Sequence, residues 1–217
     1  MGWRLHTGGR FRTWLGARFG GDLALGDRLW RRILHGLGAL ALVYYALPDD
    51  FFVVLPKLDV LLLALAAVLV LEALRHLIGL EIPTIRDYER EWVGSFAVFA
   101  TAIVAVILVF PEPIAAAVVL GTALVDPLAG ELRRREGSRS VELGVPFASY
   151  AVLAFAGLAA IGRWPVVDAA ALAVLAGAIA VAVERPKVWW FDDDLAMTLV
   201  PAVALYLVGV VGLGLPA

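Results

Sequence analysis

The chain consists of long apolar stretches without charged side chains, separated by short polar segments. An α-helix needs about 20 apolar residues to cross the roughly 30 Å hydrocarbon core of a membrane. The last stretch, Leu195–Ala217, reaches that length unaided, whereas the shortest reach it only with their flanking residues. The pattern therefore predicts an all-α membrane protein with seven transmembrane helices. The charge-free stretches are Gly36–Pro48, Val60–Leu71, Val93–Pro111, Pro113–Val125, Leu143–Gly162, Ala169–Val183 and Leu195–Ala217.

The positions of the basic residues predict how these helices are oriented. Of the 18 lysines and arginines, all but Lys57 and Arg163 lie before the first helix or in segments that follow an even number of helices. Because short cytoplasmic loops carry an excess of Lys and Arg, we expect a cytoplasmic N-terminus and a C-terminus on the other side.

The sequence also suggests how the chain is divided. Residues 1–29 form a basic segment whose apolar runs are interrupted by arginines, so no cleavable signal peptide is expected. This segment fits an amphipathic helix on the cytoplasmic membrane surface, or a basic tail that only sets topology. Residues 30–217 are expected to form one membrane-embedded catalytic domain with seven helices.

Composition narrows the choice of chemistry. Hydrophobic residues make up 62% of the chain and charged residues 18%, with a mean hydropathy of +0.87, which excludes an ordinary water-soluble enzyme. The absence of cysteine excludes thiol nucleophiles and thiolate metal sites. No phosphate-binding P-loop and no Ser/His/Asp order is present. Any catalysis must therefore use carboxylates, arginines and a metal ion. No nucleic-acid partner is expected, and the oligomeric state is left open.

Small residues recur at helical spacing in two of the predicted helices. Such faces let neighbouring backbones approach closely within a membrane, so we assign these residues to packing rather than to chemistry. They are Ala169, Ala173, Gly177 and Ala180 in one helix, and Ala148, Ala151, Ala154 and Gly157 in the other.

Asp126 is the first candidate for chemistry. Only 13 apolar residues precede it, about 20 Å of helix, so it is expected to lie short of the cytoplasmic surface. Because Pro127 disfavours helical geometry at the preceding residue, we expect the helix to stop or kink at Asp126 and a new helix to start there, with Asp126 as its N-cap. The free N–H groups of such a start can bind phosphate, and Gly130 would allow close approach.

Four arginines that follow this segment have fork-shaped donors suited to phosphate oxygens. They are Arg133, Arg134, Arg135 and Arg139. Phosphoryl transfer requires carboxylates that hold a metal ion and basic groups that hold the polyphosphate. This segment offers both. An ordinary N-cap followed by arginines that set topology is the alternative interpretation.

Three consecutive aspartates directly precede the last apolar stretch. Asp192, Asp193 and Asp194 repel one another unless a cation or basic group is near, and Mg²⁺ is usually held by one or two carboxylates together with phosphates and water. We therefore expect Mg²⁺ at Asp126 with Asp192 and Asp193, although a solvated acidic loop is the alternative.

In their order along the chain, these segments resemble the polyprenol kinases, the group that contains dolichol kinases and phytol kinases. The resemblance covers most of residues 31–208 and rests on Arg31-x-x-x-His35, on Arg86–Glu91 followed by Gly94-Ser-Phe, on Asp126-Pro-Leu-Ala-Gly130, and on Asp192-Asp193-Asp194-Leu. Arg139-Ser140-Val141-Glu142-Leu143 stands where the family has Lys-Ser-x-Glu-Gly. The resemblance adds further site candidates: His35, Arg86, Ser140, Glu142 and Glu184.

This resemblance implies a multi-pass enzyme that transfers the γ-phosphate of CTP to the terminal hydroxyl of a long isoprenoid alcohol such as dolichol, polyprenol, phytol or geranylgeraniol. With such an acceptor, Asp193 or Glu89 is the candidate for the carboxylate that orients or deprotonates the hydroxyl. The alcohol is expected to enter sideways from the bilayer, and the enzyme to reside in the cell membrane, or in the endoplasmic reticulum membrane of a eukaryote. One alternative is a CTP-dependent lipid cytidylyltransferase. A transporter, the non-enzymatic alternative, would place ionisable groups on both sides of the membrane midplane.

Overall fold

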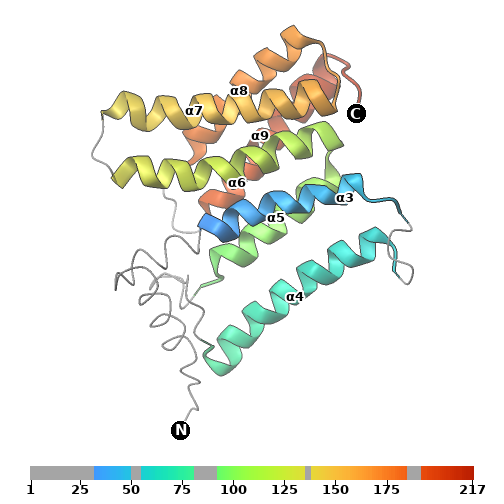
Figure 1. Ribbon diagram of the computed structural model, residues 1–217, viewed down its shortest axis with the longest axis vertical. Coiled ribbons are helices and arrows are strands. Elements are labelled where there is room, and N and C mark those ends of the chain that lie inside the picture. The colour runs from blue at the N-terminus through green and yellow to red at the C-terminus, as the bar shows by residue number, and fades with distance from the viewer. Residues whose placement is uncertain (1–31, 50–54, 81–91, 135–137, 185–191) are drawn as a thin grey trace.

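The computed structural model describes residues 32–49, 55–80, 92–134, 138–184 and 192–217, and these residues form helices without a strand (Figure 1). Each of the seven predicted stretches coincides with one helical segment. The first is Arg32–Ala46, which contains a 3₁₀ turn at Ala39–Leu42 and ends in α3 (Val43–Ala46). The others are α4 (Lys57–Ile78), α5 (Ser95–Val109), α6 (Glu112–Arg134), α7 (Arg139–Ala156), α8 (Val166–Glu184) and α9 (Asp193–Leu205). π-Helical turns extend α7 through Gly157–Ile161 and α9 through Tyr206–Gly212.

Four of these helical segments are long and apolar enough to cross a membrane: Glu112–Arg134, Arg139–Ile161, Val166–Glu184 and Asp193–Gly212. The Arg32–Ala46 and Ser95–Val109 helices are apolar but shorter, and 15 residues extend about 22 Å, less than a hydrocarbon core. The protein is thus all-helical and membrane-associated, with four candidate membrane-spanning helices among the described residues. Seven spans and a cytoplasmic N-terminus stay predictions. The basic segment 1–29 lies outside the described residues.

Helix α6 lies in the middle of the bundle and packs against α5, α7 and α9 (Figure 1). Its residues from Pro113 to Val119 are buried. Small residues permit close packing in the bundle. A Cβ added at Gly157 would lie 2.7 Å from the backbone nitrogen of Ala117 in α6, and a Cβ at Gly177 of α8 would lie 2.9 Å from the carbonyl oxygen of Phe147 in α7.

The two faces predicted for packing are confirmed to different extents. Ala169, Ala173, Gly177 and Ala180 are all buried in α8. On α7 and its π-helical extension, Ala154 and Gly157 are buried, whereas Ala148 is exposed.

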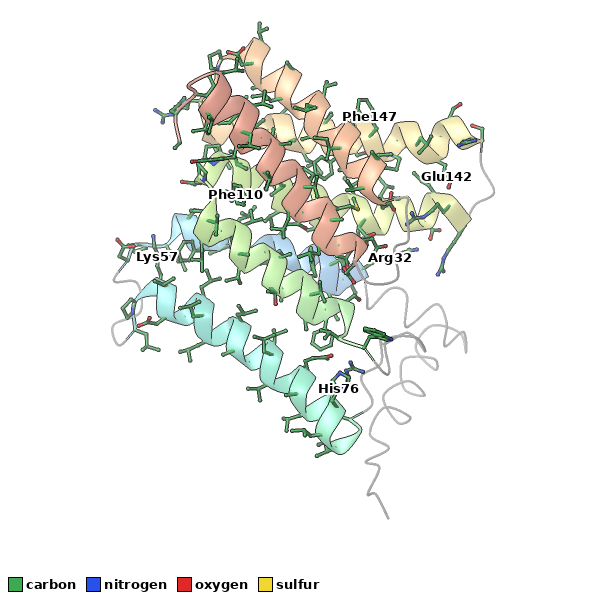
Figure 2. All side chains as sticks on the ribbon, turned by 180° about the vertical axis from the view of Figure 1, so that it is seen from behind. Arg32, Lys57, His76, Phe110, Glu142 and Phe147 are labelled. Carbon is green, nitrogen blue, oxygen red and sulfur yellow. The ribbon has the colours of Figure 1, made fainter. Side chains whose placement is uncertain are left out.

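Helix α4 lies at the edge of the bundle, where it packs against α5, and most of its leucines are exposed (Figures 1 and 2). A buried ion pair anchors its C-terminal part. The Arg75 guanidinium donates to both carboxylate oxygens of Glu72, at 2.6 and 2.8 Å. Glu72 also accepts from the Gly94 backbone N–H at 2.8 Å, and Arg75 donates to the Trp92 carbonyl at 2.5 Å. These bonds connect α4 to the start of α5.

The prediction that a helix stops at Asp126 is wrong. Helix α6 runs without interruption from Glu112 to Arg134, with Pro127 inside it, so Asp126 is not an N-cap and no helix N-terminus for phosphate lies there. A proline removes one backbone hydrogen bond and crowds the preceding turn, but membrane helices tolerate it when neighbouring groups compensate. Here Val125 and Ala129 are buried on either side of Pro127, so tertiary packing outweighs the local preference.

Candidate functional site

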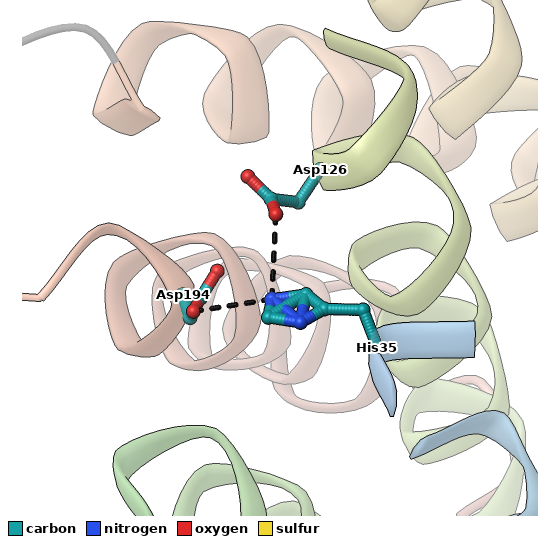
Figure 3. Close-up of side chains that lie close together, drawn as sticks. All are labelled: His35, Asp126 and Asp194. Carbon is teal, nitrogen blue, oxygen red and sulfur yellow. Dashed lines mark ion pairs between the residues drawn. The ribbon is translucent and has the colours of Figure 1, made fainter. Parts of the chain in front are cut away.

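Three polar side chains from distant parts of the chain meet at one end of the bundle. The imidazole Nε2 of His35, on the first helix, lies 3.3 Å from Asp126 Oδ2 of α6 and 3.3 Å from Asp194 Oδ2 of α9 (Figure 3). The side chains of His35 and Asp194 are 5% and 1% exposed, and that of Asp126 is 15% exposed. Such burial of two carboxylates is costly unless positive charge or hydrogen-bond donors compensate them.

The start of α9 determines which of the three aspartates points inward. Asp192 is the N-cap, and its Oδ1 accepts hydrogen bonds from the backbone N–H groups of Asp194 and Leu195. Asp194 therefore lies in the first turn, at the beginning of a buried face. The buried residues of that face recur at helical spacing: Asp194, Met197, Thr198, Pro201, Ala202 and Leu205.

Hydroxyl groups from two other helices fix this part of α9. The Thr122 hydroxyl of α6 and the Tyr150 hydroxyl of α7 both donate to the Met197 carbonyl, each at 3.1 Å. Within α9, the Thr198 hydroxyl donates to the Asp194 carbonyl at 2.7 Å. The backbone that carries Asp194 is thus held against α6 and α7.

The first helix is held just as closely. The His35 ring stacks on Phe99 of α5 with 4.6 Å between ring centroids. One turn further on, a Cβ at Gly38 would lie 2.6 Å from the Phe99 ring, so glycine is needed for the helix to approach α5 this closely. The stacking fixes the plane of the imidazole, and Nε2 points between the two carboxylates (Figure 3).

Ion pairs surround this centre. Arg32 pairs with Glu131, which connects the first helix to α6, and Arg133 pairs with the buried Glu184, which connects α6 to α8. Asp126 and Asp193 lie close enough to Glu184 to interact with it electrostatically. Acidic and basic groups from four helices therefore occupy one region.

The donor atoms of the centre fit a divalent cation. One ligand atom from each of His35, Asp126 and Asp194 lies within 4.8 Å of the other two. With metal–ligand bonds of about 2.0–2.2 Å, neighbouring donors lie roughly 3.0–3.5 Å apart, and the two 3.3 Å separations fall in this range. A second group, Asp192, Asp193 and Asp194, shares Asp194 and offers carboxylates alone.

The structure brings together only part of the predicted site. Asp126 and the aspartate triplet meet, through Asp194 rather than through the expected Asp192 and Asp193. Asp192 acts as a helix cap, and Asp193 lies beside it, partly buried. Arg133, one of the predicted phosphate ligands, pairs with Glu184, one of the further candidates, in the ion pairs around the centre. Around Gly130 a Cβ would meet nothing within 4 Å, so packing does not require glycine there.

The remaining predicted residues are not among those that meet at this centre, or they lie outside the described part of the chain. Arg134, Arg139 and Ser140 are exposed on the ends of α6 and α7. Glu142 lies on α7 at the periphery of the bundle (Figure 2). Arg86, Glu89 and Arg135 lie outside the described residues.

Sequence reasoning gave His35 a minor place and did not select Asp194, Arg32 or Glu131. The sequence does contain a signal for Asp194. An aspartate at the start of a helix is commonly its N-cap. With Asp192 as the cap, Asp194 lies on the same helix face as Met197 and Thr198, three and four residues further on. No comparable signal marks His35, since its neighbours depend on how the first helix is rotated.

Comparison of the chain with protein-family models, with curated proteins and with solved structures finds no match.

Proposed function

We propose that the protein is a multi-pass membrane kinase that transfers the γ-phosphate of CTP to the terminal hydroxyl of a long isoprenoid alcohol. One observation carries the proposal: Asp126 and Asp194, from helices far apart in sequence, meet at His35 beside the Arg133–Glu184 pair. Metal-binding carboxylates next to guanidinium groups are the combination that phosphoryl transfer uses. The resemblance to polyprenol kinases supplies the substrates.

Asp126 and Asp194 would hold the divalent ion, which neutralises charge on the transferring phosphoryl group when it is bound. Arg133 and Arg32 would bind the polyphosphate. Their partners in the structure are Glu184 and Glu131, so a nucleotide would exchange a carboxylate for phosphate oxygens, to which guanidinium groups bind as a fork. Glu184 and Glu131 thus keep the two arginines near the site when it holds no nucleotide.

The depth of the site suits an acceptor that stays in the bilayer. Asp126 lies eight residues before the end of α6 at Arg134, about 12 Å along the helix axis. A hydroxyl at the end of an isoprenoid chain can reach this level while its chain remains in lipid. Asp193, partly buried and close to Glu184, is the group we assign to orient the hydroxyl and accept its proton.

The membrane arrangement that we propose has seven spans, with the N-terminus and the site on the cytoplasmic side of the cell membrane, or of the endoplasmic reticulum membrane in a eukaryote. The positions of Lys57 and Arg163 support it, because these two cations lie at the start of α4 and just before α8. Both positions belong to connections that the alternation of basic residues puts on the outer side.

The proposal is tested with purified protein, a divalent ion and a panel of isoprenoid alcohols in bilayer discs. CTP labelled on the γ-phosphate should yield a labelled lipid, and CTP labelled on the α-phosphate should not. The reverse result would assign the protein as a cytidylyltransferase. Asp126→Asn should reduce product formation at least about 100-fold. The matched control is Asp168→Asn, which changes an aspartate in the first turn of α8 and should leave the rate unchanged.

A further inference from the structure

We infer that His35, Asp126 and Asp194 form one metal site of mixed nitrogen and oxygen donors, and that this site binds a divalent transition ion such as Mn²⁺ more tightly than Mg²⁺. The inference deepens the proposed function, on which its catalytic meaning rests, by naming the ion and adding His35 to its ligands. Ion binding itself is measured without nucleotide or alcohol.

The position of the imidazole is the first argument. His35 is buried, and its Nε2 lies at the same 3.3 Å from one oxygen of each carboxylate. Neighbouring ligands of a four- or six-coordinate ion with bonds of about 2.0–2.2 Å are separated by roughly this distance. An ion among the three atoms would therefore need only small adjustments of the side chains.

Charge balance is the second argument. Asp126 and Asp194 together carry two negative charges in a largely buried setting, and a divalent ion with a neutral imidazole would balance both charges. The nearby guanidinium groups of Arg32 and Arg133 are paired with Glu131 and Glu184. A protonated His35 would supply only one positive charge.

The donor types decide which ion is favoured. Mg²⁺ prefers oxygen ligands in regular octahedral geometry and retains several waters, whereas imidazole nitrogen suits divalent transition ions such as Zn²⁺, Fe²⁺ and Ni²⁺. Mn²⁺ is the weakest binder of that series and also accepts carboxylates, so it is the most demanding transition ion with which to test the preference. The alternative carboxylate group, Asp192 with Asp193 and Asp194, would suit Mg²⁺ better, but Asp192 Oδ1 already accepts two backbone N–H bonds as the cap of α9. The centre that contains His35 is therefore the better-formed site.

The site is also preorganised by three helices. Stacking on Phe99 fixes the His35 ring, and the hydroxyls of Thr122 and Tyr150 hold the turn of α9 that follows Asp194. Because each ligand comes from a different helix, a bound ion would connect the first helix, α6 and α9. Binding should consequently raise the thermal stability of the protein.

The test uses the full-length, tag-free protein in detergent with Mn²⁺ alone. Electron paramagnetic resonance should show one tight Mn²⁺ site, and pulsed measurements should detect coupling to an imidazole ¹⁴N nucleus in the unmodified protein. Mg²⁺ should compete at least about tenfold less well. His35→Gln should remove the ¹⁴N coupling and weaken Mn²⁺ binding at least about tenfold. The control His76→Gln, which changes the histidine beside Glu72 on α4, should leave both unchanged.

Tight Mn²⁺ binding without ¹⁴N coupling, no tight Mn²⁺ site, or equal affinity for Mg²⁺ would overturn the inference. The measurement on the unmodified protein decides even where His35→Gln fails to fold. Failure of the inference and failure of the proposed function are distinguishable. A nitrogen-coordinated Mn²⁺ site in a protein that phosphorylates no alcohol would leave the inference standing, whereas phosphorylation without nitrogen coordination would leave only the function.

Discussion

Gly121 on α6 should be indispensable for the packing that supports the site. A Cβ at this position would lie 2.6 Å from two ring atoms of Tyr150, which is fully buried and whose hydroxyl donates to the Met197 carbonyl. Gly121→Ala must therefore displace either α6 or the tyrosine ring. Both movements disturb the turn of α9 that follows Asp194.

The size of the effect follows from two contributions. Overpacking of a well-packed core costs about 1–3 kcal/mol, and loss of the Tyr150 hydrogen bond adds about 0.5–1.5 kcal/mol. Together they amount to about 1.5–4.5 kcal/mol, which corresponds to a fall in the unfolding midpoint of roughly 3–18 °C for a chain of this length. Mn²⁺ binding should weaken as well, because Asp194 lies three residues before Met197, whose carbonyl accepts this hydrogen bond.

The assay compares thermal unfolding midpoints in detergent at one heating rate. Gly130→Ala is the matched control on the same helix, since its Cβ would meet nothing within 4 Å. Alanine is favoured over glycine inside a helix by about 0.5–1 kcal/mol, so this variant should be as stable as the unmodified protein or slightly more so. Equal midpoints for Gly121→Ala and Gly130→Ala would refute the packing described for α6 and α7.

Three further sets of variants separate the roles of individual residues. Asp192→Asn should keep both the cap of α9 and the activity, whereas Asp192→Ala should cost about 1 kcal/mol of stability. Asp194→Asn should abolish Mn²⁺ binding. Loss of Mn²⁺ binding in Asp192→Asn would instead make Asp192 a ligand. Arg133→Lys should raise the KM for CTP about tenfold because the bidentate fork is lost, and a KM equal to that of the control Arg163→Lys would exclude Arg133 from the nucleotide site. Glu72→Gln should lower stability by up to about 3–5 kcal/mol, since it leaves Arg75 buried without its charged partner, while Mn²⁺ affinity stays constant; a changed affinity would show that α4 contributes to the site.

The helical segments could be predicted from the sequence because their signal is local. A run of apolar residues without charge favours a helix through its own composition, and each of the seven stretches coincides with a helix. The packing role of Ala169, Ala173 and Gly177 also followed from spacing along one helix. The continuation of α6 through Pro127 could not be predicted in this way. Burial of Val125 and Ala129 by neighbouring helices outweighs the local preference of the Asp126-Pro127 pair for ending a helix.

The site was predictable in outline and not in detail. The meeting of an aspartate of α6 with the triplet before α9 could be predicted, because the alternation of basic residues assigns both segments to the same side of the bundle. Which aspartate points inward depends on helix phase, since each residue turns the side chain by about 100°, and the cap at Asp192 turns Asp194 inward. The neighbours of His35 depend on the rotation of the first helix against Phe99, which no nearby sequence pattern records.

The central claim is that Asp126 and Asp194 share one site, and the absence of native cysteines allows a direct measurement. In an Asp126→Cys/Asp194→Cys variant with a protease site between α6 and α7, a short bifunctional thiol reagent should link the two fragments. It should not do so in the control Asp126→Cys/Asp168→Cys. We predict efficient cross-linking in the first variant, since ligand oxygens of the two aspartates lie within 4.8 Å of each other. Cleaved fragments that separate equally in both variants would contradict the shared site.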